Sequence, residues 1–304
     1  MHIDLLIVLA GFVVGGVVGL TGMGGGALMT PILVLLFNVQ PLAAVSSDLL
    51  AAMVMKPVGG GVHLRRGTVD LRLVKLLCMG SVPSAFAGVL ILKALGDSQD
   101  LEDRIKVILG VALLLAATGI VAKSLVQRGR EGGGLLPVDV RTMPLRIGPT
   151  IAIGVVGGLV VGMTSVGSGS LMIVLLLLLY PRLSAAQLVG TDLVQAIPLV
   201  ASAALGHLLF GDVELALTGS LLLGSIPGVY LGARVSANAS DQLIRPVLVV
   251  VLVLSALKLL GASNTVLLAV VGLAAVAAAA VLARRLRPGD PHRLATETLS
   301  APDR

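Results

Sequence analysis

Apolar segments long enough to cross a membrane follow one another along nearly the whole chain. Each covers about 17 to 25 residues, and a helix of that length spans a hydrocarbon core of about 30 Å. The pattern predicts an all-α polytopic membrane protein, because helices satisfy their own backbone groups within lipid. The first apolar stretch has Asp4 where a signal peptide would have basic residues, and no clear cleavage site follows it. We therefore interpret it as the first spanning helix.

One pattern of residues occurs twice in the chain, at an offset of about 144 positions. The matching positions are Gly15, Gly19, Gly24, Gly26 and Met29 with Gly158, Gly162, Gly167, Gly169 and Met172; Ser47, Asp48 and Leu49 with Thr191, Asp192 and Leu193; His63 with His207; and residues 80–83 with residues 224–227. So many matches at one offset indicate an internal repeat of two halves.

Each half is expected to hold a glycine-broken helical hairpin followed by three transmembrane helices. The hairpins are predicted at about 3–38 and 147–180, the spans at about 42–62, 74–95, 105–123, 185–206, 215–233 and 244–260, and an additional C-terminal span at about 264–283. The predicted domains are 1–127 as the first membrane repeat, 128–146 as a cytoplasmic linker, 147–260 as the second repeat, 264–283 as the extra helix and 284–304 as a polar cytoplasmic tail.

Basic residues favour opposite orientations for the two halves. If the repeats are inverted, most lysines and arginines fall on the cytoplasmic side, whereas parallel repeats would leave the basic C-terminal segment outside. We therefore predict inverted-topology repeats in the inner (plasma) membrane, with the N-terminus outside and the C-terminus cytoplasmic. Hairpin arms that meet at mid-membrane as re-entrant half-helices remain an alternative to arms that cross fully.

Composition agrees with a membrane protein and excludes several other classes. Hydrophobic residues make up 56% of the 304 positions and charged residues 12%. The formal charge of +6 comes from short loops and the tail, so it predicts orientation in the membrane and no nucleic-acid partner. Cys78 is the single cysteine, and no Cys/His cluster is present, so neither a metal nor a cofactor is expected.

The two glycine-rich breaks are the best candidates for a substrate site. Glycine runs let the backbone leave the helix, and a half-helix that begins at Gly24 or Gly167 would direct its N-terminal dipole and free N–H groups to mid-membrane. Such a position suits an anion. Close helix packing is the alternative role of glycines, favoured for the set Gly11, Gly15, Gly19, Gly154, Gly158 and Gly162.

Ionisable residues inside apolar spans are costly, so Asp48, Lys56 and Asp192 each require an explanation. The two aspartates occupy equivalent repeat positions and are candidates either for ion coupling or for helix N-caps. Lys56 has Val200 as its counterpart and precedes Pro57. We interpret it as attracting substrate, with pairing to Asp48 or snorkelling to the membrane surface as the alternatives.

Further candidates come from hydroxyl, amide and imidazole groups near these positions. His63 and His207 are candidates for gating, with simple solvation at a span end as the alternative. The complete predicted substrate-binding set is Thr21, Gly24, Gly25, Gly26, Ser46, Ser47, Lys56, Thr164, Ser165, Gly167, Ser168, Gly169, Ser170, Thr191 and Gln195. Bonding to their own helix backbone is the alternative for several of the hydroxyl side chains.

With these residues in view, the chain resembles the sulfite exporter TauE/SafE family over about residues 5–260. The resemblance rests on GLTGMGGGALMTPILVLL, PLAAVSSDLLAAM, HLRRGTVDLRLV and GSVPSAFAG in the first half, and on GMTSVGSGSLMIVLLLLL, LVGTDLVQ, GHLLFGDVE and GSIPGVYLGA in the second. It implies a permease, not an enzyme, for small sulfur-containing anions such as sulfite, sulfoacetate or related organosulfonates, usually exporting. Asp48, Lys56 and the last apolar segment are departures that leave the substrate open.

Other functions remain as alternatives to this export. An anion channel, or an importer of thiosulfate-like or sulfate-like anions, would differ in whether flux saturates and responds to a gradient. An intramembrane serine hydrolase built on Ser168 and His207 is a remote alternative from another class. The expected partners are a small anion and the lipid bilayer, with proton coupling and a homo-oligomer left open.

Overall fold

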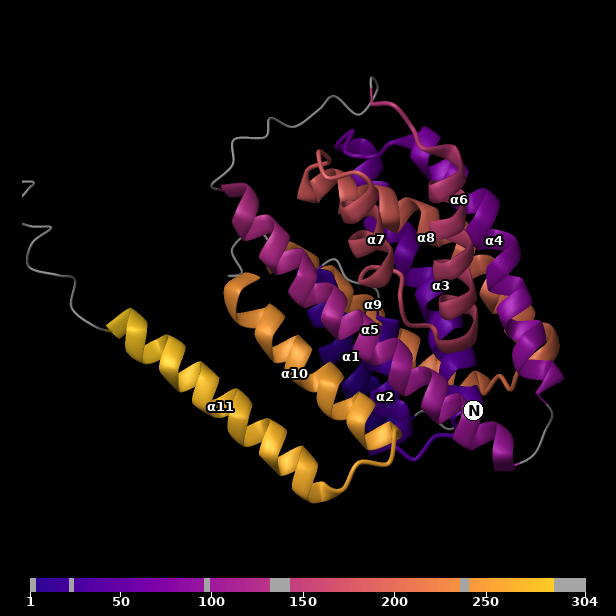
Figure 1. The fold of residues 1–304 in the computed structure, drawn as a ribbon. Coiled ribbons are helices and arrows are strands. Elements are labelled where there is room, and N and C mark those ends of the chain that lie inside the picture. The colour runs from indigo at the N-terminus through magenta and orange to yellow at the C-terminus, as the bar shows by residue number, and fades with distance from the viewer. Residues whose placement is uncertain (1–3, 22–24, 96–98, 132–142, 236–240, 287–304) are drawn as a thin grey trace, which may run out of the picture. The chain divides into compact units, whose positions relative to one another are not determined.

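The computed structural model of the chain describes residues 4–21, 25–95, 99–131, 143–235 and 241–286. Within these ranges the chain forms helices and no strand, which confirms the predicted all-α class (Figure 1). The helices are α1 (Leu5–Thr21), α2 (Gly26–Leu36), α3 (Pro41–Arg65), α4 (Leu71–Ala94), α5 (Gln99–Glu131), α6 (Ile147–Thr164), α7 (Leu171–Leu179), α8 (Ala185–Phe210), α9 (Leu215–Val235), α10 (Asp241–Leu259) and α11 (Asn264–Leu286).

Six of the described helices are long and apolar enough to cross a membrane. They contain the segments Pro41–Arg65, Leu71–Ala94, Leu101–Ala122, Ile147–Thr164, Ala186–Phe210 and Leu215–Gly232. The segments Leu5–Leu20, Gly26–Leu36, Pro246–Leu259 and Asn264–Val276 are shorter apolar helices. A chain with this many apolar helices is a multi-pass membrane protein.

The chain divides into two compact units, Met1–Gly261 with α1 to α10 and Ala262–Arg304 with α11. Most of the predicted linker, and the tail beyond residue 286, lie outside the described residues. The proposed division into two repeats, linker, extra helix and tail stays a prediction.

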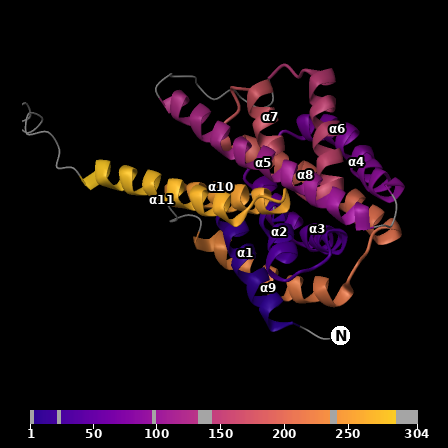
Figure 2. The same ribbon diagram turned by 60° about the horizontal axis from the view of Figure 1, so that its bottom comes forward.

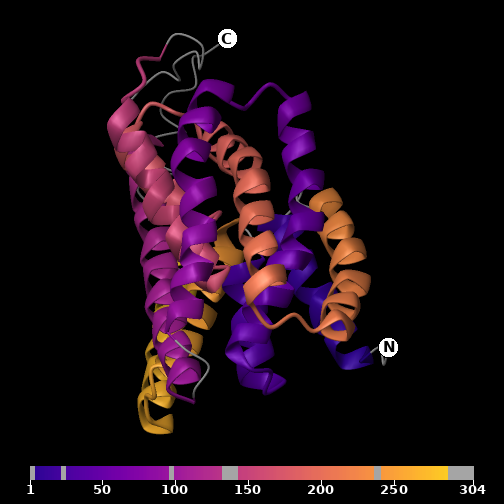
Figure 3. The same cartoon turned by 90° about the vertical axis from the view of Figure 1, so that its right-hand side faces the viewer.

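Helices of the first unit pair across the two halves of the sequence. The first arm of each hairpin packs along the fourth helix of the other half, α1 along α9 and α6 along α4 (Figures 1 and 2). The equivalent helices α3 and α8 pack on each other, as do α5 and α10. Most helices of this unit run up and down the view in Figure 3. Each half therefore contacts the other through the same helices, its first and its fourth among them, as expected for two similar halves.

Glycines bring the paired helices into backbone contact. A Cβ added to any of three glycines of α6 would collide with α4: Gly154 with the Leu77 carbonyl, Gly158 with Ser81, and Gly162 with Ala85. Gly11 and Gly15 of α1 are equally close to Leu221 and Ser225 of α9. The packing role that the sequence suggested for these five glycines is therefore confirmed.

The central helices α3 and α8 are antiparallel. Ser46, near the start of α3, bonds His207, near the end of α8. Gly60, near the end of α3, lies against Val194, in the first half of α8. The short second arms α2 and α7 contribute the fully buried pairs Met29 with Leu33 and Met172 with Ile173 to the core, so both arms pack into the protein interior.

Candidate substrate site

The break between α6 and α7 is an irregular, buried turn. Ser165 ends α6 with φ 60°, and Gly167 and Gly169 have φ values of 125° and 94°. Only glycine adopts such values at little cost, which explains both glycines. Thr164 supports the turn, because its hydroxyl donates to the Val160 carbonyl at 2.6 Å and accepts from the Val166 N–H at 3.1 Å. Thr164 is thus occupied by its own backbone, the alternative that short hydroxyl side chains always offer.

The break between α1 and α2 is described only in part. Gly24 lies outside the described residues, as does the side chain of Thr21 at the end of α1. Gly25 has helical angles, and the position of a Cβ on it would lie 3.6 Å from the Met55 methyl group. Gly26 lies directly against the Ser165 carbonyl of the other break. The structure therefore brings together the two breaks that the repeat predicted as a pair.

Lys56 reaches the α6–α7 break from α3. Its side chain is buried, and its Nζ donates to Ser168 Oγ at 2.5 Å. Asp48 and Asp192 both lie within electrostatic range of this ammonium group. Ser168 therefore contacts Lys56 rather than His207, and the Ser/His pair required for an intramembrane hydrolase is not formed.

Asp48 lies where three elements meet. Thr30 of α2 donates to Asp48 Oδ2 at 2.9 Å, and the Ser165 hydroxyl lies beside the same carboxyl group. Asp48 Oδ1 is buried and accepts no hydrogen bond from the residues that the structure describes. Since α3 begins at Pro41, Asp48 sits in the helix interior, and the interpretation of this aspartate as an N-cap is wrong.

Asp192 has a different setting on α8. Gln195 Nε2 donates to Asp192 Oδ1 at 3.1 Å, and Ser81 of α4 donates to Gln195 Oε1 at 3.2 Å. The Thr191 hydroxyl accepts from the backbone N–H of Asp70 at 3.3 Å. Ser184 caps α8, so Asp192 is not an N-cap either. Thr191 and Gln195 thus act within the protein, by tying α8 to the start and middle of α4.

The two histidines differ in burial. His207 is fully buried, its Nδ1 2.8 Å from Ser46 Oγ and its Nε2 2.9 Å from the Gly162 carbonyl. It therefore joins α8 to α3 and α6 and is not a solvated residue at a span end. His63 is partly exposed, with Nδ1 3.0 Å from the Thr68 hydroxyl.

The site contains two residues that sequence reasoning missed. Thr30 bonds Asp48, but its repeat counterpart is Ile173, so the repeat gave no signal for it. Ser81 holds Gln195 and does have a hydroxyl counterpart, Ser225, in the matching segment 224–227. That repeated serine could have been noticed. Ser47 and Ser170 have buried hydroxyls without a hydrogen bond among the described residues.

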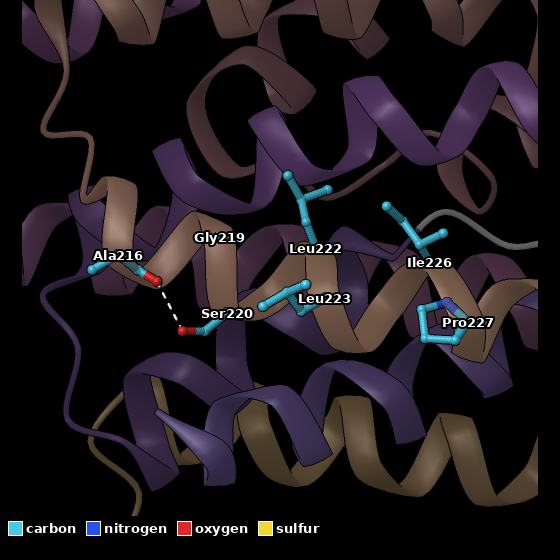
Figure 4. A pocket seen from close by; sticks show the side chains of 7 residues that line it. All are labelled: Ala216, Gly219, Ser220, Leu222, Leu223, Ile226 and Pro227. Atoms are coloured by element: carbon cyan, nitrogen blue, oxygen red, sulfur yellow. Dashed lines mark hydrogen bonds between the residues drawn. The ribbon is translucent and has the colours of Figure 1, made fainter. Parts of the chain in front are cut away.

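A separate groove of about 440 Å³ runs along α9 and offers no anion site (Figure 4). It is lined by Ala216, Gly219, Ser220, Leu222, Leu223, Ile226 and Pro227. Its one hydroxyl, on Ser220, donates to the Ala216 carbonyl at 2.8 Å. None of the predicted substrate residues lines it.

Comparison with known proteins agrees with a multi-pass membrane protein. Residues 7–259 match the family described as "Sulfite exporter TauE/SafE". The chain belongs to this family. Its members are membrane transporters, which makes this TauE/SafE protein a transporter and not an enzyme. Among the residues that the structure describes, no group of three or more His, Cys, Asp or Glu side chains could hold a metal ion.

Three relatives from Bacillus subtilis (strain 168) are similar over most of their length. "Probable membrane transporter protein YjnA" is 40% identical over 257 residues, which cover 84% of this TauE/SafE chain and 98% of the relative. "Probable membrane transporter protein YdhB" is 23% identical over 231 residues, or 76% and 89% of the two chains. "Probable membrane transporter protein YunE" is 23% identical, and the match covers 84% of this chain and 97% of the relative. No solved structure matches the chain.

Proposed function

We propose that this protein is a permease that exports small sulfur-containing oxyanions, such as sulfite, sulfoacetate or related organosulfonates, across the cytoplasmic membrane. The observation that carries the proposal is the buried Lys56 ammonium bonded to Ser168 within the α6–α7 break. A buried cation inside a membrane protein marks a pathway for an opposite charge. The family description, with sulfite export in its name, supports the chemical class.

The anion-binding region of this proposal lies between the two breaks, near residues 24–26 and 167–170. The contact of Gly26 with Ser165 supports it, because it makes the two breaks neighbours. A helix N-terminus favours negative charge, and α7 begins directly after Ser170. The Cβ position of Gly25 is already in contact with the Met55 methyl group. Gly25→Leu would therefore overfill the anion-binding region and abolish transport.

Inverted repeats are the second part of the proposal. The antiparallel crossing of α3 and α8 supports it, because equivalent helices of inverted halves must run in opposite directions. Arg65, Arg66, Arg72 and Lys75 are exposed in and beside the turn between α3 and α4, as expected for a cytoplasmic end of two spanning helices. In the inner membrane, this orientation would place the N-terminus outside and the C-terminus in the cytoplasm.

Purified protein in liposomes tests the function. Vesicles loaded with sulfite, sulfoacetate, thiosulfate or sulfate, with an imposed pH gradient, should release at least one sulfur anion with saturable kinetics. Flux that rises linearly with concentration and ignores the gradient would instead identify a channel. If none of the four anions moves, the proposed substrate class is wrong.

A further inference from the structure

We infer that only one of the two repeat-related breaks binds the anion's oxygen atoms: the α6–α7 break, where Lys56, Ser168 and Ser170 form the oxyanion subsite. The described end of the α1–α2 break, Gly25 and Gly26, then only packs beside it. This inference rests on the proposed function and makes its site asymmetric.

Charge distinguishes the two breaks first. Lys56 is 7% exposed and extends from α3 to Ser168 in the second break. Its repeat counterpart on α8 is Val200, which is buried in an apolar cluster with Leu49 and Ala203. A cation therefore serves the α6–α7 break and has no equivalent at the matching position of α8.

Hydroxyl groups distinguish them next. Ser168 and Ser170 are both buried, and the Ser170 hydroxyl has no hydrogen-bond partner among the described residues. A buried hydroxyl without a partner costs free energy unless something else bonds it. The repeat counterparts of these serines are Gly25 and Ala27, which carry no hydroxyl at all.

Backbone geometry points the same way. The turn from Ser165 to Gly169 holds three residues with positive φ, so the chain leaves helical geometry before α7 begins at Leu171. In the described part of the other break, Gly25 keeps helical angles and α2 begins at once with Gly26. Gly26 rests on the Ser165 carbonyl, so this side closes on its neighbour.

These groups match the oxygen face of a compact oxyanion. An ammonium group has three N–H donors and each serine has one O–H donor, and charge-assisted bonds to oxyanions are about twice as strong as neutral ones. Lys56 uses one donor for Ser168. A sulfite or sulfonate group, with three oxygens on one side of sulfur, has as many acceptor atoms as this subsite has donor groups in the ammonium and the two serines.

The test measures the concentration of sulfite that half-saturates counterflow in proteoliposomes, for wild type and single variants. Ser170→Ala and Lys56→Met should each raise it about tenfold or more, and Lys56→Arg should recover part of the loss because the charge remains. Ser225→Ala is the matched control, since Ser225 is another buried serine without a partner among the described residues, but on α9. It should leave half-saturation unchanged.

Each outcome decides one question. If Ser170→Ala and Ser225→Ala have the same half-saturation concentration, whether unchanged or raised, the single subsite is wrong while the permease function stands. Adding the missing hydroxyl to the first break with Ala27→Ser should not tighten sulfite binding, and a clear gain would show that both breaks bind. Monodisperse elution and an unchanged Tm establish that each variant is folded. If wild type moves no sulfur anion, the proposed function fails together with the inference.

Discussion

Three buried ionisable side chains share one region of the protein, and their charges do not cancel. Lys56 provides one positive charge, while Asp48 and Asp192 provide two negative charges when ionised. Buried charges require partners, and the Lys56 ammonium group lies within electrostatic range of both carboxylates. Thr30 gives Asp48 a hydrogen bond and Gln195 gives one to Asp192. A proton on one carboxyl group would balance the charges of this region, and we expect an anion then to approach Lys56 with less repulsion.

The sequence identified these three charged residues but not their partners. A charge within an apolar run is visible in the sequence, and so is the repeat that equates Asp48 with Asp192. Ser168 bonds Lys56 from 112 positions away, a contact that no local spacing encodes. The N-cap interpretation failed because α3 and α8 begin about two turns earlier than the aspartates, at Pro41 and Ala185.

The buried His207 should stabilise the fold through its two hydrogen bonds. The Gly162 carbonyl can only accept, so Nε2 donates to it, while Nδ1 lies 2.8 Å from Ser46 Oγ, whose hydroxyl is also placed to donate to the Leu42 carbonyl. His207→Ala should lower the free energy of unfolding by about 1 to 3 kcal/mol, because buried partners lose their bonds. His207→Gln should cost less, since an amide can also donate and accept. Thermal unfolding in detergent measures both, and equal losses would show that the bonds contribute nothing.

At the scale of helices, the sequence predicted the elements well and their neighbours poorly. Both broken hairpins and all the predicted spans correspond to helices in the described residues, because each apolar run has clear polar limits. Spacing also marked close-packing glycines of α1 and α6, but it did not mark those of the facing helices, such as Gly80 of α4 and Gly224 of α9. It did not show that α1 contacts α9 or that α6 contacts α4, since a repeat reveals which helices are equivalent and not which ones touch.

The glycine face of α6 offers a matched pair of variants. Gly154→Ala should destabilise the protein by about 1 to 3 kcal/mol, because the new methyl group would collide with the Leu77 carbonyl and force α4 and α6 apart. Gly148, in the first turn of the same helix, has no atom within 4 Å of its Cβ position. Gly148→Ala should therefore be neutral or stabilising by up to about 1 kcal/mol. The Tm values of the two variants test this expectation, and a similar fall in Tm for both would contradict the packing argument.

At the scale of the whole molecule, the topology can be tested at two turns. Thr68 follows α3 and Asp212 follows α8, and these two helices are antiparallel, so their C-terminal ends should face opposite sides of the membrane. In a Cys78→Ala background, a membrane-impermeant maleimide should label Asp212→Cys in intact cells and Thr68→Cys only after permeabilisation. Labelling of both positions from one side would rule out the inverted repeats.

Coupling to protons is the prediction that joins the site to transport. Asp48 lies near Lys56 and the hydroxyls of Thr30 and Ser165, and a second carboxylate, Asp192, is within electrostatic range of the same Lys56. A proton on Asp48 removes one negative charge from this group and lets its carboxyl donate a hydrogen bond. Anion binding should therefore strengthen as the pH falls, and a pH gradient should drive flux.

Asp48→Asn fixes that position in a neutral form of nearly the same shape, so it isolates the role of the proton. In liposomes loaded with sulfite, wild-type flux should rise with an imposed pH gradient, and the Asp48→Asn variant should carry sulfite at a rate that no longer responds to it. Asp103→Asn is the matched control, because Asp103 is an exposed carboxylate paired with Lys106 at 3.0 Å, away from the site. It should keep the full response. An Asp48→Asn variant that also keeps the full response would assign coupling to another group, with Asp192 the next carboxylate beside Lys56.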